Sequence, residues 1–150
     1  MEAEVYPDER VARFVNERFI PVKIHIKEQP KSFHRFDTQW TPTAVLLDSK
    51  GKERHRFEGF LPVEDFLAQL RLGLAKIDFS YKQFKAAEER FRAIAEELPK
   101  TDAAPEALYW AGVSKYKATD DGSALSDTAA ALSAAYPDSI WAKKASVWSS

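Results

Sequence analysis

A proline turn placed directly before a short apolar run constrains this chain more than any other feature of its sequence. The turn reads Trp40-Thr41-Pro42-Thr43, and the run that follows reads Ala44-Val45-Leu46-Leu47. Proline fixes its own φ and disfavours the helical region for the residue before it, so no regular helix is expected through this point. A run that is apolar at successive positions is typical of a strand buried on both faces. We therefore predict a tight turn at Pro42 and a buried strand over 44–47.

Upstream of this turn, the apolar period changes from that of a helix to that of a strand. Asp8 can cap a helix whose apolar residues follow a three-to-four spacing: Val11, Phe14 and Val15. Alternation over 19–26 predicts a strand with four apolar residues on one face: Ile20, Val22, Ile24 and Ile26. A short helix is expected over 31–36. Residues 1–6 are expected to be the last turn of a preceding element.

Downstream of the apolar run, we predict a hairpin and a helix. Residues 48–52 form the hairpin loop, in which Gly51 can adopt a positive φ, and 53–57 return as a second strand. The charged run 52–56 is expected to be the solvent-facing side of an edge strand. Gly59 ends that strand and Pro62 opens the helix. The predicted buried face of this helix contains Phe66, Leu67, Leu70 and Leu74.

The rest of the sequence is predicted to be helical. An amphipathic helix over 81–98 ends at Pro99, and further helices begin at Pro105, Ser123 and Ser139. Two sets of residues have the spacing of the second helix of a tetratricopeptide repeat: Ala87, Phe91, Ile94 and Pro99, then Leu125, Ala129, Leu132 and Pro137. The two prolines are 38 residues apart, against about 34 in that repeat. The first-helix signature fits less well, because Tyr116 comes one residue later after Gly112 than the repeat places its aromatic residue.

Composition removes several classes of function. The 150 residues contain no cysteine, which excludes disulfides, thiolate metal sites, cysteine nucleophiles and dithiol redox chemistry in this polypeptide. The net charge of −1 gives no general attraction to nucleic acid or anionic lipid. No apolar run approaches the roughly 20 residues that span a bilayer. The acidic start, residues 1–4, lacks the pattern of a signal peptide, so we expect a cytoplasmic protein that binds neither membrane nor nucleic acid.

The histidines also lack the pattern of a catalytic or metal site. His25 and His55 are expected to point outward from strands, and His34 lies on a polar helix. None has the helical i, i+4 partner or the carboxylate spacing of a metal site. No glycine-rich phosphate loop and no Ser-His-Asp order is present. We therefore expect no metal and no cofactor.

From Val5 to Phe79 the order of elements resembles the later part of a bacterial thioredoxin-like protein. Thr41-Pro42-Thr43 lies where that family has its cis-proline loop, and residues 8–26 resemble the segment after the redox helix. The resemblance implies an incomplete α/β thioredoxin-like domain over 1–79, with about three strands flanked by helices. An all-α, tetratricopeptide-like hairpin or repeat region then occupies 80–150.

The departure from that family is large. Met1-Glu2 falls where the relatives have just left their Cys-x-x-Cys motif, so the family's first strand and both cysteines are missing from this chain. In the family that strand is central, between the counterparts of 20–26 and 44–47. Its absence predicts a gap in the sheet. Either the three remaining strands close this gap by pairing directly, or a second chain fills it, as in a homodimer through unpaired strand edges.

Two functions remain open on this reading. In the first, the chain is the C-terminal part of a thiol-disulfide oxidoreductase begun at an internal methionine, and is itself redox-inactive. In the second, it is a complete, non-catalytic module that binds a peptide or protein. The candidate peptide-binding residues are Trp40, Thr41, Pro42 and Thr43, with packing as the alternative role of Trp40. The candidate partner-binding residues are Tyr109, Trp110 and Trp141, with packing in the helical core as their alternative role.

Overall fold

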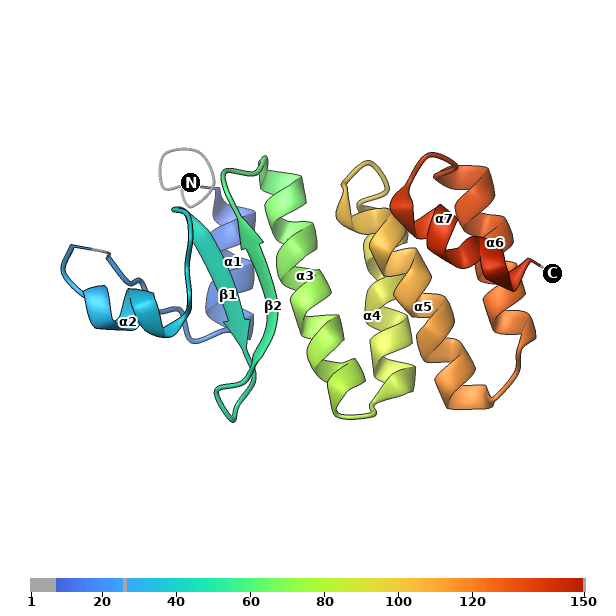
Figure 1. Cartoon of the computed structure of the whole chain (residues 1–150), viewed down its shortest axis with the longest axis horizontal. Coiled ribbons are helices and arrows are strands. Elements are labelled where there is room, and N and C mark those ends of the chain that lie inside the picture. The colour runs from blue at the N-terminus through green and yellow to red at the C-terminus, as the bar shows by residue number, and fades with distance from the viewer. Residues whose placement is uncertain (1–7, 26, 150) are drawn as a thin grey trace.

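A small sheet with two helices lies at one end of the molecule, and a row of helices extends from it (Figure 1). The computed structural model describes residues 8–25 and 27–149. The elements are α1 (Glu9–Arg18), α2 (Pro30–Arg35), β1 (Thr43–Leu47), β2 (Glu53–Glu58), α3 (Val63–Ser80), α4 (Phe84–Glu97), α5 (Ala103–Thr119), α6 (Ser123–Ala135), α7 (Ile140–Ala145) and a last 3-10 turn, η1 (Ser146–Trp148). The expectation for residues 1–6 lies outside the described residues.

The predicted hairpin is confirmed. β1 and β2 pair antiparallel, from Thr43 opposite Glu58 to Leu46 opposite His55, with an irregularity after Leu46. Gly51 adopts φ +78° in the connecting loop, where its missing Cβ removes the steric penalty of this conformation. The Thr41–Pro42 peptide bond that precedes β1 is cis.

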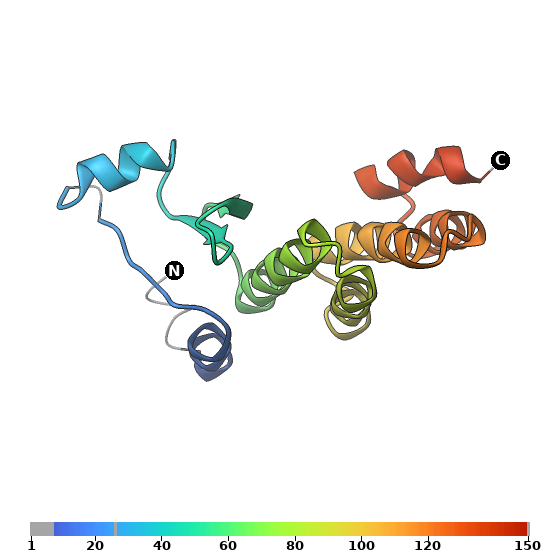
Figure 2. The same ribbon diagram turned by 90° about the horizontal axis from the view of Figure 1, so that it is seen from below.

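The predicted strand over 19–26 is wrong for residues 19–25, and Ile26 lies outside the described residues. Residues 19–25 have no regular secondary structure, and Ile20 and Val22 are 94% and 78% exposed. Among the described residues the sheet has two strands, β1 and β2, rather than about three. A strand needs a neighbour for its backbone hydrogen bonds, and residues 19–25 run apart from the sheet between α1 and α2 (Figure 2).

The expectation that β1 is buried on both faces is also wrong. Leu46 is 4% exposed, whereas Leu47, which points to the other face, is 36% exposed. Leu46 joins Phe66 and Leu70 of α3 in one apolar cluster. A Cβ at Gly73 of α3 would lie 2.2 Å from Leu46 Cδ2, so glycine allows this close approach of helix and strand. No helix gives the Leu47 face comparable cover within residues 8–25 and 27–149.

Helix α1 supplies the remaining buried residues of this cluster. The backbone N–H of Arg10 donates to Asp8 Oδ1 at 2.9 Å, which confirms Asp8 as the N-cap. Val11 and Val15 are buried together with Leu46 and Phe66. The predicted apolar face of α1 is therefore the face that packs toward the sheet and α3.

Helices α3 to α7 carry most of the core. One cluster joins α3, α4 and α5 through their fully buried residues: Ala68, Leu72, Ala75, Ala87, Phe91, Ile94, Ala103, Ala107 and Ala111. The predicted helix over 81–98 is present as α4 but begins at Phe84, because Lys82 adopts φ +60° in the turn after α3. Helix α3 packs on β2 as well as on α4 and α5. The division at residue 79 and the tetratricopeptide likeness stay predictions.

Candidate functional site

Large apolar side chains are exposed around Pro42, at the end of the hairpin where β1 begins. The N–H of Gly59 donates to the C=O of Pro42 at 2.8 Å, and this bond joins the loop before β1 to the loop after β2. Trp40, in the first loop, is 65% exposed, and Phe60, in the second, is 72% exposed. We call Trp40, Thr41, Pro42, Thr43 and Phe60 the Pro42 surface.

Within this surface the loop is held by its own hydrogen bonds. The Thr43 hydroxyl donates to the C=O of Trp40 at 2.6 Å, which closes the turn around Pro42. The structure thus brings together the four predicted residues of the loop. Phe60 was missed by sequence reasoning, although the hairpin register would have found it, since Thr43 pairs with Glu58 and Phe60 follows two residues later.

The edge of β1 that faces away from β2 has a second set of accessible groups. The hydrogen bond from the Gly59 N–H to the Pro42 C=O lies one residue beyond the pair Thr43–Glu58. Hydrogen-bonded and non-hydrogen-bonded pairs alternate along an antiparallel ladder, so Thr43–Glu58 and Val45–Arg56 are non-hydrogen-bonded pairs. Thr43 and Val45 therefore direct their N–H and C=O groups away from β2. We call these four backbone groups the outer edge. No strand among the described residues pairs with it.

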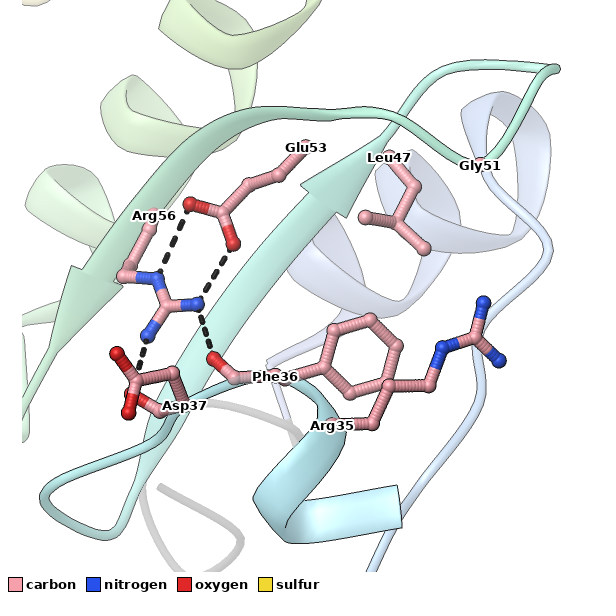
Figure 3. Close-up of a pocket in the computed structure, with 7 residues that line it drawn as sticks. All are labelled: Arg35, Phe36, Asp37, Leu47, Gly51, Glu53 and Arg56. Carbon is pink, nitrogen blue, oxygen red and sulfur yellow. Dashed lines mark hydrogen bonds and ion pairs between the residues drawn. The ribbon is translucent and has the colours of Figure 1, made fainter.

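A shallow pocket of about 310 Å³ lies between the end of α2 and the hairpin (Figure 3). It is lined by Arg35, Phe36, Asp37, Leu47, Gly51, Glu53 and Arg56. The Arg56 guanidinium donates to Glu53 Oε1 at 2.6 Å and to the backbone carbonyl oxygens of Phe36 and Asp37. The hydrogen bond to Glu53 raises the pKa of Arg56. Arg56 thus ties α2 to β2, and its donors are engaged within the protein.

The predicted solvent-facing charged run over 52–56 is wrong for Arg54. Its Nε donates to Asp48 Oδ2 at 2.9 Å, and the Tyr81 hydroxyl donates to the same oxygen at 3.0 Å. The backbone N–H of Lys52, together with these two side chains, lowers the pKa of Asp48 to about 2. This network joins the hairpin loop to Tyr81, which caps the end of α3, and its polar groups are engaged with one another.

His55 also points inward, contrary to expectation. Its Nε2 lies 2.7 Å from Gln69 Oε1 and its Nδ1 lies 3.3 Å from Lys76 Nζ, both on α3. Lys76 in turn pairs with Glu106 of α5 at 2.8 Å. Burial and the nearby Lys76 ammonium lower the pKa of His55, so the ring is neutral at pH 7. The side chain faces α3 because Leu46, its partner in the ladder, also faces α3.

The described residues offer neither a metal site nor a membrane helix. His25 and His34 are exposed and lie apart from His55 in the fold. Among residues 8–25 and 27–149, no group of three or more histidine, aspartate or glutamate side chains could hold a metal ion. In the same part of the chain, no helix is long and apolar enough to cross a bilayer.

The aromatic candidates in the helical region contact one another. The ring of Tyr109 stacks on Trp148 with centroids 4.7 Å apart and lies 5.1 Å from Trp141. Trp110 meets Phe79 of α3 edge to face at 5.4 Å. These contacts give the rings a packing role, and each ring is half-buried. A partner-binding role for Tyr109, Trp110 and Trp141 stays a prediction.

Comparison with known proteins finds a similarity over residues 1–73. Residues 1–73 match the family model described as a thioredoxin-like domain. The match covers α1, α2, the hairpin and the first part of α3, and it ends before α4. No curated protein and no solved structure gives a match to this sequence. Residues 1–73 are therefore similar to a thioredoxin-like domain, and the sequence contains no cysteine for dithiol chemistry.

Proposed function

We propose that this protein is a redox-inactive, thioredoxin-like unit that binds an extended peptide or protein segment at the Pro42 surface. The observation that carries the proposal is the exposure of Trp40 and Phe60 in the two loops that the Gly59–Pro42 hydrogen bond joins. Large aromatic rings are costly to leave in water, and they are enriched among the residues that dominate binding energy at interfaces. Because the sequence has no cysteine, it has no dithiol chemistry of its own, and binding is the role left to the domain.

The geometry assigns different parts to the residues of this surface. Trp40 and Phe60 supply apolar contact area. The C=O of Pro42 already accepts a hydrogen bond from Gly59, which leaves it one lone pair for a ligand. The resemblance to thioredoxin-like proteins implies that backbone groups beside the proline pair with an extended substrate. Thr41, which is exposed, is the residue here that supplies them.

The test is peptide binding by the full-length protein and its variants. A peptide selected from a random library on the immobilised protein is labelled, and its affinity is measured by fluorescence anisotropy. Trp40→Ser and Phe60→Ser should each weaken binding by about tenfold or more, as hot-spot aromatics do. Ile140→Ser is the matched control, because Ile140 is 57% exposed but lies on α7. Equal effects of all three variants, or no effect of the first two, would refute a binding role for the Pro42 surface.

A second function is favoured by the outer edge of β1, with which no strand of the described residues pairs. In this alternative the chain is the C-terminal part of a thiol-disulfide oxidoreductase, whose central strand and Cys-x-x-Cys motif lie outside the sequence. The intact mass of the endogenous protein in its native cells decides between the two. A mass above 17.0 kDa, with an N-terminal peptide that contains Cys-x-x-Cys, supports the oxidoreductase. A mass equal to 17.0 kDa excludes it and leaves the binding module.

A further inference from the structure

We infer that the outer edge of β1 is a second binding site, which takes up one extended segment of alternating apolar and acidic residues as a third strand of the sheet. The site adjoins the Pro42 surface at Thr43 but uses backbone groups rather than the aromatic rings. It therefore does not depend on ligand binding at the Pro42 surface, but it is incompatible with the oxidoreductase alternative, in which a central strand would occupy this edge. Three observations carry it: the direction of the backbone groups, the different character of the two faces of β1, and the charge of the neighbouring segment.

The first observation is the ladder itself. Thr43 and Val45 present two N–H and two C=O groups away from β2, in the extended conformation that strand pairing requires. No described strand satisfies them. An accessible edge of this kind is a template for an added strand, with affinity supplied by main-chain hydrogen bonds.

The second observation concerns the side chains on the two faces of β1. Leu46 packs against α3, while Leu47 lines the pocket beside Phe36 on the opposite face. A strand added at the outer edge would extend both faces. Its apolar side chains would continue the Leu46 face, and the acidic side chains between them would lie on the Leu47 face, where Arg35 also lines the pocket. Residues 19–25 and α2 lie on the side of β1 away from β2 (Figures 1 and 2), and Ile20 and Val22 there are exposed.

The third observation selects the charge of the occupant. Residues 18–36 contain five basic side chains and one acidic side chain, Glu28, which gives this segment a net charge of +4. The remaining residues then have a net charge of −5, since the net charge of the whole protein is −1. All five basic residues are exposed: Arg18, Lys23, Lys27, Lys31 and Arg35. Acidic residues on the occupant would complement this segment, and basic residues would be repelled.

The direct test is hydrogen exchange in the full-length protein. The probe is a synthetic peptide of about ten residues in which Val and Glu alternate, a length typical of a strand. On addition of this peptide, the amides of Thr43 and Val45 should become protected from exchange, because they donate to its backbone. The same peptide with Lys in place of Glu should bind at least about tenfold more weakly. Unchanged exchange at these two amides, or equal affinity for both peptides, would overturn the inference.

Variants separate this site from its neighbour. Val45→Pro removes an outer-edge N–H without removing a bond to β2, so it should abolish peptide binding, whereas Val45→Ile should retain it. Trp40→Ser should leave the affinity for the Val-Glu peptide within about twofold if the two sites are separate. A protein that sediments as a dimer, and becomes a monomer on Val45→Pro, would instead assign the edge to a second copy and overturn the peptide inference. The exchange experiment needs no variant, so it decides even if Val45→Pro fails to fold.

Discussion

The helical region and the sheet region use similar residues with very different results. In α3 to α5, apolar side chains such as Leu72, Phe91 and Ile94 are fully buried. Among the described residues before α3, the buried apolar side chains are Val11, Val15 and Leu46, while Ile20, Val22, Trp40 and Phe60 face solvent. The contrast lies in the partners that each region has available, since both regions are rich in apolar residues.

The difference reflects how each element satisfies its backbone. A helix makes its hydrogen bonds internally and needs only an apolar neighbour, which the next helix along the sequence provides. A strand makes its hydrogen bonds to another strand, and the segment 19–25 has none beside it among the described residues. For this reason both proposed binding sites lie in the sheet region.

The largest expected effect is the difference in stability loss between two phenylalanine-to-alanine substitutions, one in each region. Phe91→Ala should lower the free energy of unfolding by about 3–5 kcal/mol, because the ring is fully buried between α3, α4 and α5. Phe60→Ala, at an exposed ring, should lower it by less than about 0.5 kcal/mol. Urea denaturation measures both, and similar losses at the two positions would remove the contrast between the regions.

Trp110 tests whether the aromatic cluster belongs to the core. Its ring contacts Phe79, Tyr109 and Trp141, so Trp110→Ala should cost about 3 kcal/mol with a lower midpoint of urea unfolding. A loss below about 1 kcal/mol, with unchanged helical circular dichroism, would place the ring at a surface and favour the partner-binding role.

Close packing between α5 and α6 should make one glycine irreplaceable. A Cβ at Gly112 would lie 2.0 Å from Thr128 Oγ1 and 2.6 Å from Thr128 Cβ, so rotation of the threonine does not relieve the overlap. Gly112→Ala should therefore cost about 1–3 kcal/mol despite the better helix propensity of alanine. Gly122→Ala is the control, since no atom lies within 4 Å of its Cβ position. A neutral Gly112→Ala would show that the helices separate more easily than the structure indicates.

A pH-dependent effect is expected at the hairpin. The pKa of Asp48 is lowered from 3.8 to about 2 in the fold, so its carboxylate stabilises the fold above about pH 4 and this contribution is lost as the pH falls toward 2. Asp48→Asn should lower the urea midpoint at about pH 6 and lower it less at about pH 3. Asp127→Asn, at an exposed position on α6, should change the midpoint little at either pH. A constant difference for Asp48→Asn at both pH values would contradict the lowered pKa.

The smallest effect should be at the exposed segment. Ile20→Ser should change the free energy of unfolding by less than about 0.5 kcal/mol, because the side chain is almost fully in water. Val11→Ser, at a fully buried position on α1, should lower the free energy of unfolding several times more. A loss above about 1 kcal/mol at Ile20 would show that residues 19–25 are packed in solution.

Sequence reasoning located the elements better than their surroundings. It placed the N-cap at Asp8, the turn at Pro42, the hairpin with Gly51 and the helices after Pro62. These features depend on residues that are near one another in the sequence, such as a capping carboxylate or a proline ring. It missed the inward direction of His55 and the exposure of Phe60, since both depend on which segments meet across the fold.

By itself, the sequence determined the absence of dithiol chemistry, the positions of the helices and the hairpin, and the likeness of the first half to a thioredoxin-like domain. The tertiary structure alone decided that residues 19–25 are not a strand, that β1 is covered on one face, and that Trp40 and Phe60 are exposed beside Pro42. The physical reason is the range of the interactions. Helix caps and turns are settled within a few residues, whereas a strand exists only if a distant segment supplies its hydrogen bonds and its cover.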